Sequence, residues 1–597
     1  MSKPIKSRLE QLRAVMQRNG IAAYIVPSTD AHQSEYVPPC WQRRQWISGF
    51  TGSAGDVVVT LRAAALWTDG RYFLQAEQEL AGSDIELCKI GQKDTLSIET
   101  WLRKQLSAGE TVGIDPKLLS PTLRTRLQKE LGEAEIGLTL VDLNLIDQIW
   151  TDQPAAPDSP IELYPVRYAG ETSSAKLKRL RRELKQRQAT AHVLTALDAI
   201  AWLFNIRGTD VPFNPVAICN AVIGADSATL FIDATKIPAT VGKKLSSQIE
   251  IAPYDAFATA LEELSTQRAT VWVDEQATNS WVLERLANAT LIRERSPIWQ
   301  MKAKKNDTEL AGMQQAHLRD GVAMVRFLAW LDHALAAEEQ IDEVSVATKL
   351  ERLRSEGSNY RGQSFAPIAG YGANGAVIHY SASPESASRL RRHGLFLIDS
   401  GGQYLDGTTD ITRTVALGKP TAAQKQHFTR VLKGHIAIAS CVFPEGTSGR
   451  QIDVLARQAL WQAGLDYAHG TGHGVGCYLN VHEGPQSINP WRCTGVPLEA
   501  GNVLSNEPGY YLTGEYGIRI ENLLAVRQSD VGPGFLCFEE LTLCPIDIQL
   551  VVSGMLSAGE LKWLNDYHAR VRRELLPLLP AAEARWLRAA TKRLQRR

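Results

Sequence analysis

Carboxylates at the ends of two predicted strands are the first residues that could carry chemistry. The apolar run 395–398 leads into Asp399, and a glycine-rich turn lets the chain fold back before Asp410 begins an alternating strand. These two carboxylates are eleven residues apart and could meet where the strands pair. Buried carboxylates that meet repel each other and require a cation between them. The alternative is that both aspartates are ordinary turn or cap residues.

A histidine-rich segment forms the second candidate group, with His469, His473 and His482 inside 14 residues. On a helix, the spacing of the first two would suit a zincin, whose motif also requires a Glu directly after the first histidine. Gly470 stands at that place, and glycines at 470, 472, 474 and 476 each cost a helix about 1 kcal/mol relative to Ala. We therefore predict a glycine-rich strand or loop that carries a ligand histidine and a second histidine at the site's edge.

Two glutamates make up the third group. Glu507 stands directly before Pro508-Gly509, which predicts a sharp bend. Farther along, alternation with isoleucines places Arg519 and Glu521 on the same face of a strand. For Glu521, a surface salt bridge with Arg519 is an equal alternative.

Together these groups predict a metal site. Oxygen ligands with one imidazole suit Mn²⁺, with Zn²⁺ or Co²⁺ as alternatives, and disfavour a thiolate site. Four carboxylates carry too much charge for one dication. Two divalent ions that activate water between them are therefore the simplest solution.

Elements of mixed type must position these residues. Helices alternate with strands from residue 7 onward, which predicts α/β domains, and three prolines in the ten residues 151–160 predict a linker. A second block has a basic helix at 174–188, with a solvated face as the favoured role. Its strand-rich segments are predicted at 199–206, 215–223, 228–232 and 270–273. A capping box at 306–309 predicts a long helix, strands follow from 395, and the tail from 558 is helical. The two blocks could be related, although no repeat is clear enough to establish it.

Composition limits the classes of function. The 597 residues suggest three or four domains, and 65 basic residues balance 65 acidic ones. This balance argues against a dedicated nucleic-acid or anionic-membrane binder. With neither a signal-peptide core nor 18 uninterrupted apolar residues, we expect a cytoplasmic protein without a membrane partner. The eight scattered cysteines predict free thiols.

The motifs around these residues resemble a known family. The five candidate ligands resemble the dinuclear site of the pita-bread (creatinase/methionine aminopeptidase) fold, in the order Asp399, Asp410, His473, Glu507, Glu521. The sequence segments around them resemble the long, three-domain Xaa-Pro aminopeptidase (aminopeptidase P) family of M24 peptidases, as in DSGGQYLDGTTDITRT, HGTGHGVGCYLNVHEGP and EPGYYLTGEYGIRIEN. The likeness reaches the N-terminal block in WISGFTGSAG and the tail in EELTLCPID. One small departure is Asn506, where an acidic residue is expected.

The resemblance implies a fold and an activity. The fold class is α/β (α+β), with two creatinase-N-like α/β domains at 1–155 and 156–300 and a pita-bread catalytic domain with a helical extension at 301–597. The implied activity is hydrolysis of the N-terminal Xaa-Pro bond of peptides with proline second, in a homodimer. A prolidase limited to dipeptides is the alternative enzyme. A non-catalytic pita-bread binding module is the alternative of another class.

The resemblance also implies roles for single residues. His379, His469 and His482 match the family's substrate-side histidines, which hold the carbonyl oxygen, the proline region or the leaving group. Glu507 would be both a metal ligand and the acceptor of the proton from the attacking water. Arg519 is expected to orient a carboxylate rather than to touch substrate.

Overall fold

The computed structural model describes residues 2–247, 249–491 and 495–596. The chain divides into two compact units, which are described separately: residues 1–164 with 171–298, and residues 165–170 with 299–597. Among the described residues, none of the helices combines the length and the apolar character needed to cross a membrane. The described cysteines are all free thiols, and Cys493 lies outside the described residues.

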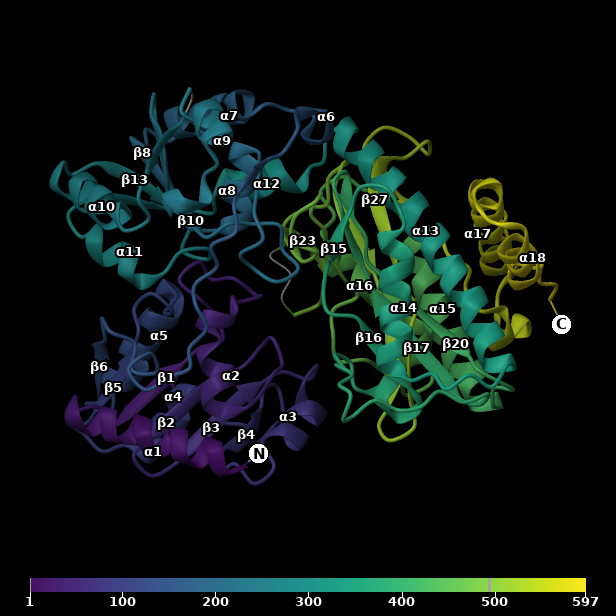
Figure 1. Ribbon diagram of the computed structural model, residues 1–597, viewed down its shortest axis with the longest axis horizontal. Helices are drawn as coiled ribbons and strands as arrows, with labels where there is room; N and C mark the ends of the chain where they lie inside the picture. Colours follow the sequence, from purple (N-terminus) through teal and green to yellow (C-terminus); the bar gives the residue numbers. More distant parts are fainter. Residues whose placement is uncertain (1, 248, 492–494, 597) are drawn as a thin grey trace. The chain divides into compact units, whose positions relative to one another are not determined.

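The N-terminal unit contains two six-stranded sheets with the same topology, in the strand orders β4-β3-β2-β1-β5-β6 and β12-β11-β10-β8-β13-β14 (Figure 1). In each sheet, the first three strands in chain order pair antiparallel with one another. The other strand pairs of each sheet are parallel. This agreement supports a relation between the two blocks that sequence periodicity alone could not establish.

The elements of the first half are β1 Ala23–Val26, β2 Asp56–Thr60, β3 Ala64–Thr68, β4 Glu86–Lys89, β5 Thr111–Ile114, β6 Gly137–Leu140, α1 Ser2–Arg18, α2 Arg43–Ser48, α3 Phe73–Glu79, α4 Ile98–Gln105 and α5 Pro121–Gly132. Those of the second half are β7 Glu162–Leu163, α7 Ser173–Gln186, β8 Ala191–Leu194, α8 Leu197–Phe204, β9 Ile206–Arg207, β10 Cys219–Gly224, β11 Ala228–Ile232, α9 Ala239–Leu245, β12 Glu250–Ala252, α10 Ala256–Thr266, β13 Thr270–Val273, α11 Ser280–Arg285 and β14 Thr290–Arg293.

One predicted element of this unit is wrong. The segment 199–206, predicted to be strand-rich, lies mostly in α8, a helix whose eight residues are all buried. A helix that is apolar on every side has no amphipathic period, so a short apolar run does not distinguish it from a buried strand.

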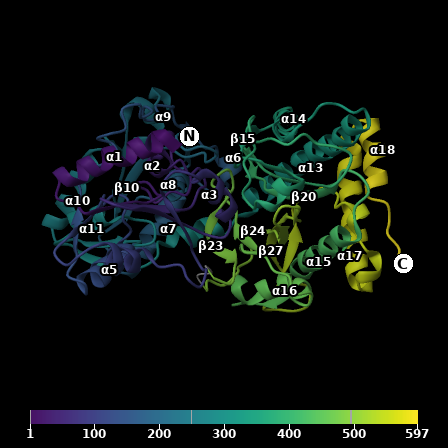
Figure 2. The same ribbon diagram turned by 90° about the horizontal axis from the view of Figure 1, so that it is seen from below.

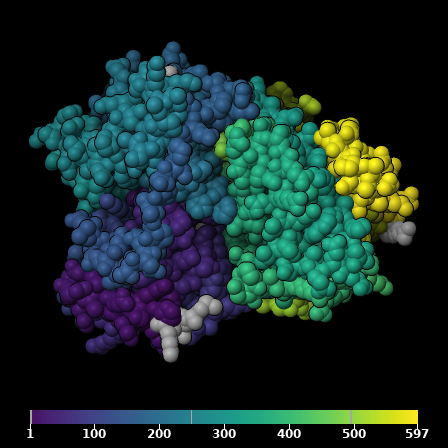
Figure 3. Space-filling view, viewed as in Figure 1, coloured from purple at the N-terminus to yellow at the C-terminus, as the bar shows by residue number. Residues whose placement is uncertain are grey.

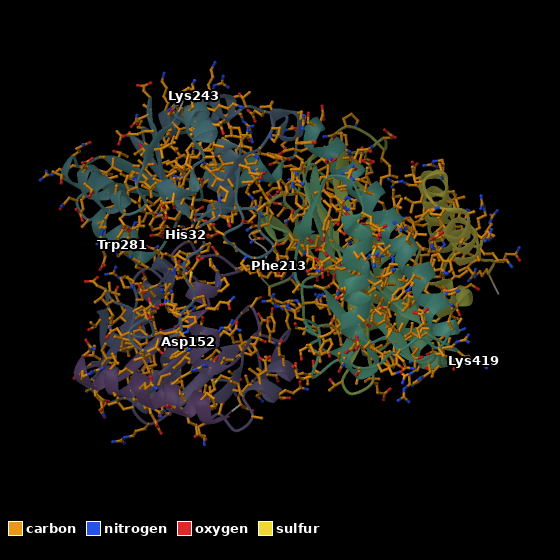
Figure 4. The ribbon with its side chains drawn as sticks, viewed as in Figure 1. His32, Asp152, Phe213, Lys243, Trp281 and Lys419 are labelled. Atoms are coloured by element: carbon orange, nitrogen blue, oxygen red, sulfur yellow. The ribbon has the colours of Figure 1, made fainter. Side chains whose placement is uncertain are left out.

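A buried histidine ties the two halves of the N-terminal unit together. His32, labelled in Figure 4, follows the first half's β1, and its Nδ1 lies 2.8 Å from the Thr195 carbonyl oxygen of the second half. Its Nε2 lies 3.0 Å from the Tyr254 hydroxyl. Both ring nitrogens therefore have partners, and His32 acts as a structural residue.

Within its described residues, the C-terminal unit combines helices with one large sheet and three small ones. Its helices are α6 Val166–Ala169, α12 Pro297–Ala303 (which begins in the other unit), α13 Asp307–Ala336, α14 Glu343–Ser355, α15 Ala422–Ala439, α16 Gly449–Trp461, α17 Ala558–Leu575 and α18 Ala581–Ala590. The small sheets are β16-β17-β20 (Ile368–Tyr371, Leu395–Ser400, Ile411–Ala416), β15-β18-β19 (Tyr360–Gln363, Gly402–Tyr404, Gly407–Thr408) and the hairpin β25-β26 (Gly509–Leu512, Tyr516–Arg519). The large sheet is β21-β28-β27-β24-β22-β23 (Val442–Pro444, Phe535–Glu540, Asn522–Gln528, Val503–Asn506, Gly472–Gly474, Glu483–Ile488).

Two helical layers hold these sheets in place. Helices α13 and α14 lie beside β16, β17 and β20 (Figure 1). They pack on this sheet through buried apolar side chains such as Phe327, Leu350 and Ile398. Helices α15 and α16 pack on the large sheet, where Ala456 and Leu524 belong to one core cluster (Figure 2). Burial of each such side chain contributes roughly 1.5–3 kcal/mol, so packing fixes the strand ends that carry the candidate ligands.

Hydrogen bonds define the start of helix α13 and attach the C-terminal helices to it. Helix α13 begins with the predicted capping box, in which Asn306 and Glu309 satisfy each other's backbone N–H groups. The C-terminal helices α17 and α18 lie on the surface, coloured yellow in Figure 3, and the Trp586 indole donates to Asp332 of α13 at 2.6 Å. The helical tail is thus part of the C-terminal unit and not a loose extension.

Candidate metal centre

The two aspartates lie at the same end of a pair of antiparallel strands. Asp399 of β17 is paired in register with Thr412 of β20, and Asp410 directly precedes β20. Both side chains are buried. The turn between them needs glycine, because a Cβ on Gly401 would lie 2.0 Å from the Thr409 carbonyl oxygen. The predicted fold-back therefore brings the two carboxylates to one point.

The histidine and the glutamates come from the large sheet. His473 lies in β22 and pairs with β23, while Glu507 follows β24 and its N–H donates to the Thr471 carbonyl at 2.8 Å. Strands β22 and β24 approach so closely that a Cβ on Gly472 would lie 1.9 Å from the Ser505 carbonyl oxygen. The glycines of this motif thus permit a close strand contact, as expected for a strand rather than a helix.

These residues converge. One ligand atom each from Asp410, His473 and Glu521 lies within 4.8 Å of the others. His473 Nε2 is 3.4 Å from Asp410 Oδ2 and 3.6 Å from Glu507 Oε1. The negative charges of Asp410 and Glu507 also act on Asp399. Asp410, His473, Glu507 and Glu521 therefore form one cluster, and the charge effects place Asp399 in its neighbourhood.

The charges in this cluster are unfavourable without a cation. Burial raises the pKa of Asp399 to about 7, and the negative charge of Asp410 contributes although Arg519 opposes it. Burial together with Asp410 and Asp399 raises the pKa of Glu521 well above its ordinary value. Burial would lower the pKa of His473, but hydrogen bonding to Asp410 and the charge of Glu507 raise it to about 9. Raised pKa values of this kind indicate that the acidic side chains repel one another and that a bound cation would stabilise their charged forms.

The donor atoms suit divalent metal ions. Asp399 Oδ1 is buried and has no hydrogen-bond partner among the described residues, although its other oxygen accepts a bond from Arg519. A buried carboxylate oxygen without a donor is costly, and a cation would satisfy it. Four carboxylates and one imidazole form the oxygen-rich donor set that hard or borderline divalent ions bind.

Hydrogen bonds from neighbouring residues orient the candidate ligands, and neither Thr412 nor Tyr511 was predicted from the sequence to be among these residues. Arg519 donates to Asp399 Oδ2 at 2.6 Å and to the Tyr511 hydroxyl at 2.6 Å, so it pairs with Asp399 and not with Glu521. Thr412 donates to Glu521 Oε2 at 2.7 Å and accepts from Arg519 Nε. Period-two alternation from Asp410 could have identified Thr412 as a residue on the same strand face.

The three other histidines predicted for the site, His379, His469 and His482, have different surroundings. The His482 and His473 rings meet edge to face with centroids 4.4 Å apart. His469 Nε2 lies 2.8 Å from the Tyr511 hydroxyl, which links it to Arg519. His379 is half-buried after a 3₁₀ turn, 372–376, that packs on β26. The contacts thus place His482 against His473, the candidate ligand, and connect His469 through Tyr511 to Arg519, which bonds to Asp399.

Protein-family models match nearly the whole chain. A model described as metallopeptidase family M24 matches residues 311–528, and one for the C-terminal region of these peptidases matches 534–594. Two models of the creatinase/prolidase N-terminal domain match residues 8–149 and 152–309.

Individual relatives agree with these matches. The probable Xaa-Pro aminopeptidase P of Aspergillus niger is 45% identical over 580 residues, which cover 94% of each chain. The protein of the same description from Chaetomium globosum is 45% identical and covers 95% of this chain and 96% of its own.

Solved structures extend the likeness to the fold. The X-prolyl aminopeptidase of Caenorhabditis elegans, described as a cytosolic enzyme with a di-nuclear active site, superposes with a TM-score of 0.96 at 38% identity and covers 99% of this chain and 100% of its own. A Xaa-Pro dipeptidase from Bacillus anthracis has a TM-score of 0.50 at 22% identity, covers 63% of this chain and 99% of its own, and shows only a shared fold. The chain belongs to the Xaa-Pro aminopeptidase P family of M24 metallopeptidases, with two creatinase-type domains ahead of the peptidase domain.

Proposed function

We propose that this protein is an aminopeptidase that removes the N-terminal residue from peptides with proline in the second position. The observation that carries the proposal is the convergence of Asp410, His473 and Glu521, one ligand atom of each within 4.8 Å of the others, beside Asp399 and Glu507. Its support is the end-to-end likeness to an X-prolyl aminopeptidase described as having a di-nuclear active site. The domain boundaries that we propose lie near residues 155 and 300.

The proposed metal ligands are Asp399, Asp410, His473, Glu507 and Glu521. Two divalent ions match the charge of four carboxylates, and the ligand chemistry favours Mn²⁺ over Zn²⁺ or Co²⁺. When bound, such ions activate water and stabilise the negative charge that develops on the scissile carbonyl oxygen. Arg519 and Thr412 hold Asp399 and Glu521 in orientation through the hydrogen bonds described above.

The protein's own residues then handle protons and substrate. We assign Glu507 as the acceptor of the proton from the attacking water, because burial raises its pKa and His473 lies 3.6 Å away. His379, His469 and His482 are proposed to bind the carbonyl oxygen, the proline region or the leaving group. An Xaa-Pro bond lacks an N–H, so recognition depends on such side chains and not on backbone pairing to the scissile amide.

Peptide length separates this proposal from a prolidase. The dipeptidase structure covers 63% of this chain, whereas the aminopeptidase structure covers 99%. With Mn²⁺ supplied, we expect the purified protein to hydrolyse an Xaa-Pro-Pro tripeptide and longer Xaa-Pro peptides, and to leave Xaa-Ala-Pro intact. Cleavage of the Xaa-Pro dipeptide alone would favour a prolidase. No cleavage and no stimulation by any divalent ion would favour a binding module.

We also propose that the protein is a cytoplasmic homodimer that associates through its C-terminal unit. Exposed apolar side chains on that unit support a contact surface: Val454 and Trp461 are 44% and 48% exposed and lie seven residues apart on α16. The C. elegans protein is described as cytosolic. Light scattering should give a mass near 132 kDa, twice the 65.8 kDa of one chain, and a mass of one chain would reject the dimer.

A further inference from the structure

A buried carboxylate next to the candidate site is held by two lysines. Glu483 accepts a hydrogen bond from Lys302 Nζ to Oε2 at 2.6 Å, and Lys305 Nζ bonds its other oxygen, Oε1. All three side chains are at most 1% exposed. Lys302 belongs to α12 and Lys305 follows that helix, whereas Glu483 begins β23. We name this cluster the lysine clamp.

The geometry of the lysine clamp exceeds what charge neutralisation requires. Taking an ion out of water is expensive, and one lysine would already neutralise one carboxylate. Here each carboxylate oxygen has its own ammonium donor, which prevents the carboxylate from rotating. Lys305 Nζ also donates to the Lys302 carbonyl at 3.2 Å, so a hydrogen bond connects the two lysines directly. The clamp therefore holds the start of β23 in one place.

The start of β23 adjoins the metal-site histidine. Glu483 pairs with Gly474, the residue after His473, and a Cβ on Gly474 would lie 2.2 Å from the Glu483 carbonyl oxygen. The residue before Glu483 is His482, whose ring meets His473 with centroids 4.4 Å apart. A shift of Glu483 would therefore move the His482 ring relative to the ligands.

We propose that Lys302 and Lys305 are positioning residues that hold Glu483 and thereby fix His482 for the hydrolysis. This inference rests on the proposed function, since it assigns a task to a residue proposed to face substrate. Displacing a group at a reacting centre by about 1 Å can cost on the order of 100-fold in rate. Loss of one lysine should lower kcat 10- to 100-fold, with a change in KM smaller than about threefold, because the ion site and most substrate contacts remain.

The test compares Lys302→Met and Lys305→Met with a matched control, Lys304→Met. Lys304 lies between them in sequence, but its side chain is 58% exposed and pairs with Glu499 at 3.5 Å. We expect Lys304→Met to keep kcat within twofold. Metal content should equal that of the unmodified protein in all three variants. If the methionine variants do not fold, Glu483→Gln and Glu483→Asp test the clamp while leaving both lysines, because Gln replaces one acceptor oxygen by an amide NH₂ and Asp retracts both oxygens.

A second readout does not depend on activity. The ¹³C–¹H signal of the His482 ring, assigned by its loss in His482→Gln, should shift in Lys305→Met and stay unchanged in Lys304→Met. A folded Lys305→Met or Glu483→Gln variant with unchanged kcat and an unmoved His482 signal would overturn the proposal. If the unmodified protein cleaves no Xaa-Pro peptide, the proposed function fails, whereas the ring signal still decides whether the clamp positions His482.

Discussion

His192 in the N-terminal unit and His473 in the C-terminal unit both lie on strands, yet their surroundings have opposite electrostatics. His192 is buried in β8 with Nδ1 2.9 Å from the Trp272 carbonyl oxygen and Nε2 2.8 Å from the Ser296 hydroxyl. Burial lowers the pKa of His192 to about 4. His473 also loses solvent, but Asp410 and Glu507 raise its pKa to about 9.

The contrast separates a structural histidine from a candidate metal ligand. Neutral partners satisfy both nitrogens of His192, so the ring needs nothing further from a ligand. The partners of His473 are acids that repel one another until a cation joins them. Burial of a histidine is therefore weak evidence of a site, whereas a surplus of like charge around it is strong evidence.

The largest effect is expected from Glu521→Gln. The variant keeps the bond from Thr412 but removes a ligand charge, so turnover should fall at least ~1,000-fold, or about 4 kcal/mol in activation free energy. Without metal, the variant should unfold at a higher temperature than the unmodified protein, because the buried carboxylate whose pKa is raised is gone. Steady-state kinetics and calorimetry measure both. The control is Glu539→Gln, a partly exposed partner of Arg527. Equal activity in Glu521→Gln and its control would refute the ligand assignment.

His192→Ala is expected to lower the stability of the protein and to leave its activity nearly unchanged. Removing the ring leaves the Trp272 carbonyl and the Ser296 hydroxyl without their partner and opens a cavity, which should cost about 3 kcal/mol of the free energy of unfolding. Activity per folded molecule should stay within twofold. Denaturant unfolding monitored beside kcat checks this, and a specific loss of kcat or of bound metal would contradict the structural role.

The candidate site was more predictable from sequence than its supports. Asp399 and Asp410 flank a glycine turn between two strands, and His473 lies between the glycines of a strand, so local sequence patterns mark all three residues. Thr412 and the lysine clamp depend on partners far along the chain: Lys302 and Glu483 are 181 residues apart. Alternation from Asp410 places Thr412 on the same strand face, but the identity of these distant partners follows from tertiary packing, which periodicity does not reveal.

The secondary structure was likewise predictable only where local sequence patterns define an element. The strand at 270–273 was predicted with the observed bounds because β-branched residues and turn signals delimit it. Helix α8 was missed because its residues 199–204 are all apolar and show no helical period. The common topology of the two N-terminal sheets became visible only from strand pairing.

A third histidine extends the contrast to pH. Burial lowers the pKa of His568 on α17 to about 3, and its Nε2 accepts the Ile546 N–H at 3.1 Å. Because the folded pKa lies below the unfolded value, this histidine's contribution to stability is complete above about pH 6.5 and falls as pH drops toward 3. At pH 5 the loss should reach ~2 kcal/mol relative to pH 7. Chemical denaturation at both pH values should show a difference in His568→Gln smaller by that amount, and an unchanged difference would contradict the assignment.

The smallest effect is expected from Thr412→Val, which keeps the shape of the side chain but removes its bonds to Glu521 and Arg519. Loss of a bond that orients a ligand should weaken metal affinity about tenfold. Calorimetric titration with Mn²⁺ measures it. The control is Thr348→Val, whose hydroxyl bonds only to the Val344 carbonyl of its own helix at 2.9 Å. Equal affinities in the two variants would show that Thr412 does not orient the ligand.

The most direct test of the central claim is a titration of metal-free protein with Mn²⁺, in which bound ions per chain are counted while Xaa-Pro-Pro hydrolysis is followed. We predict two ions per chain, with hydrolysis appearing as the sites fill and absent in Glu521→Gln. Full hydrolysis by the metal-free protein, or binding of two ions with no hydrolysis of any Xaa-Pro peptide, would contradict the account.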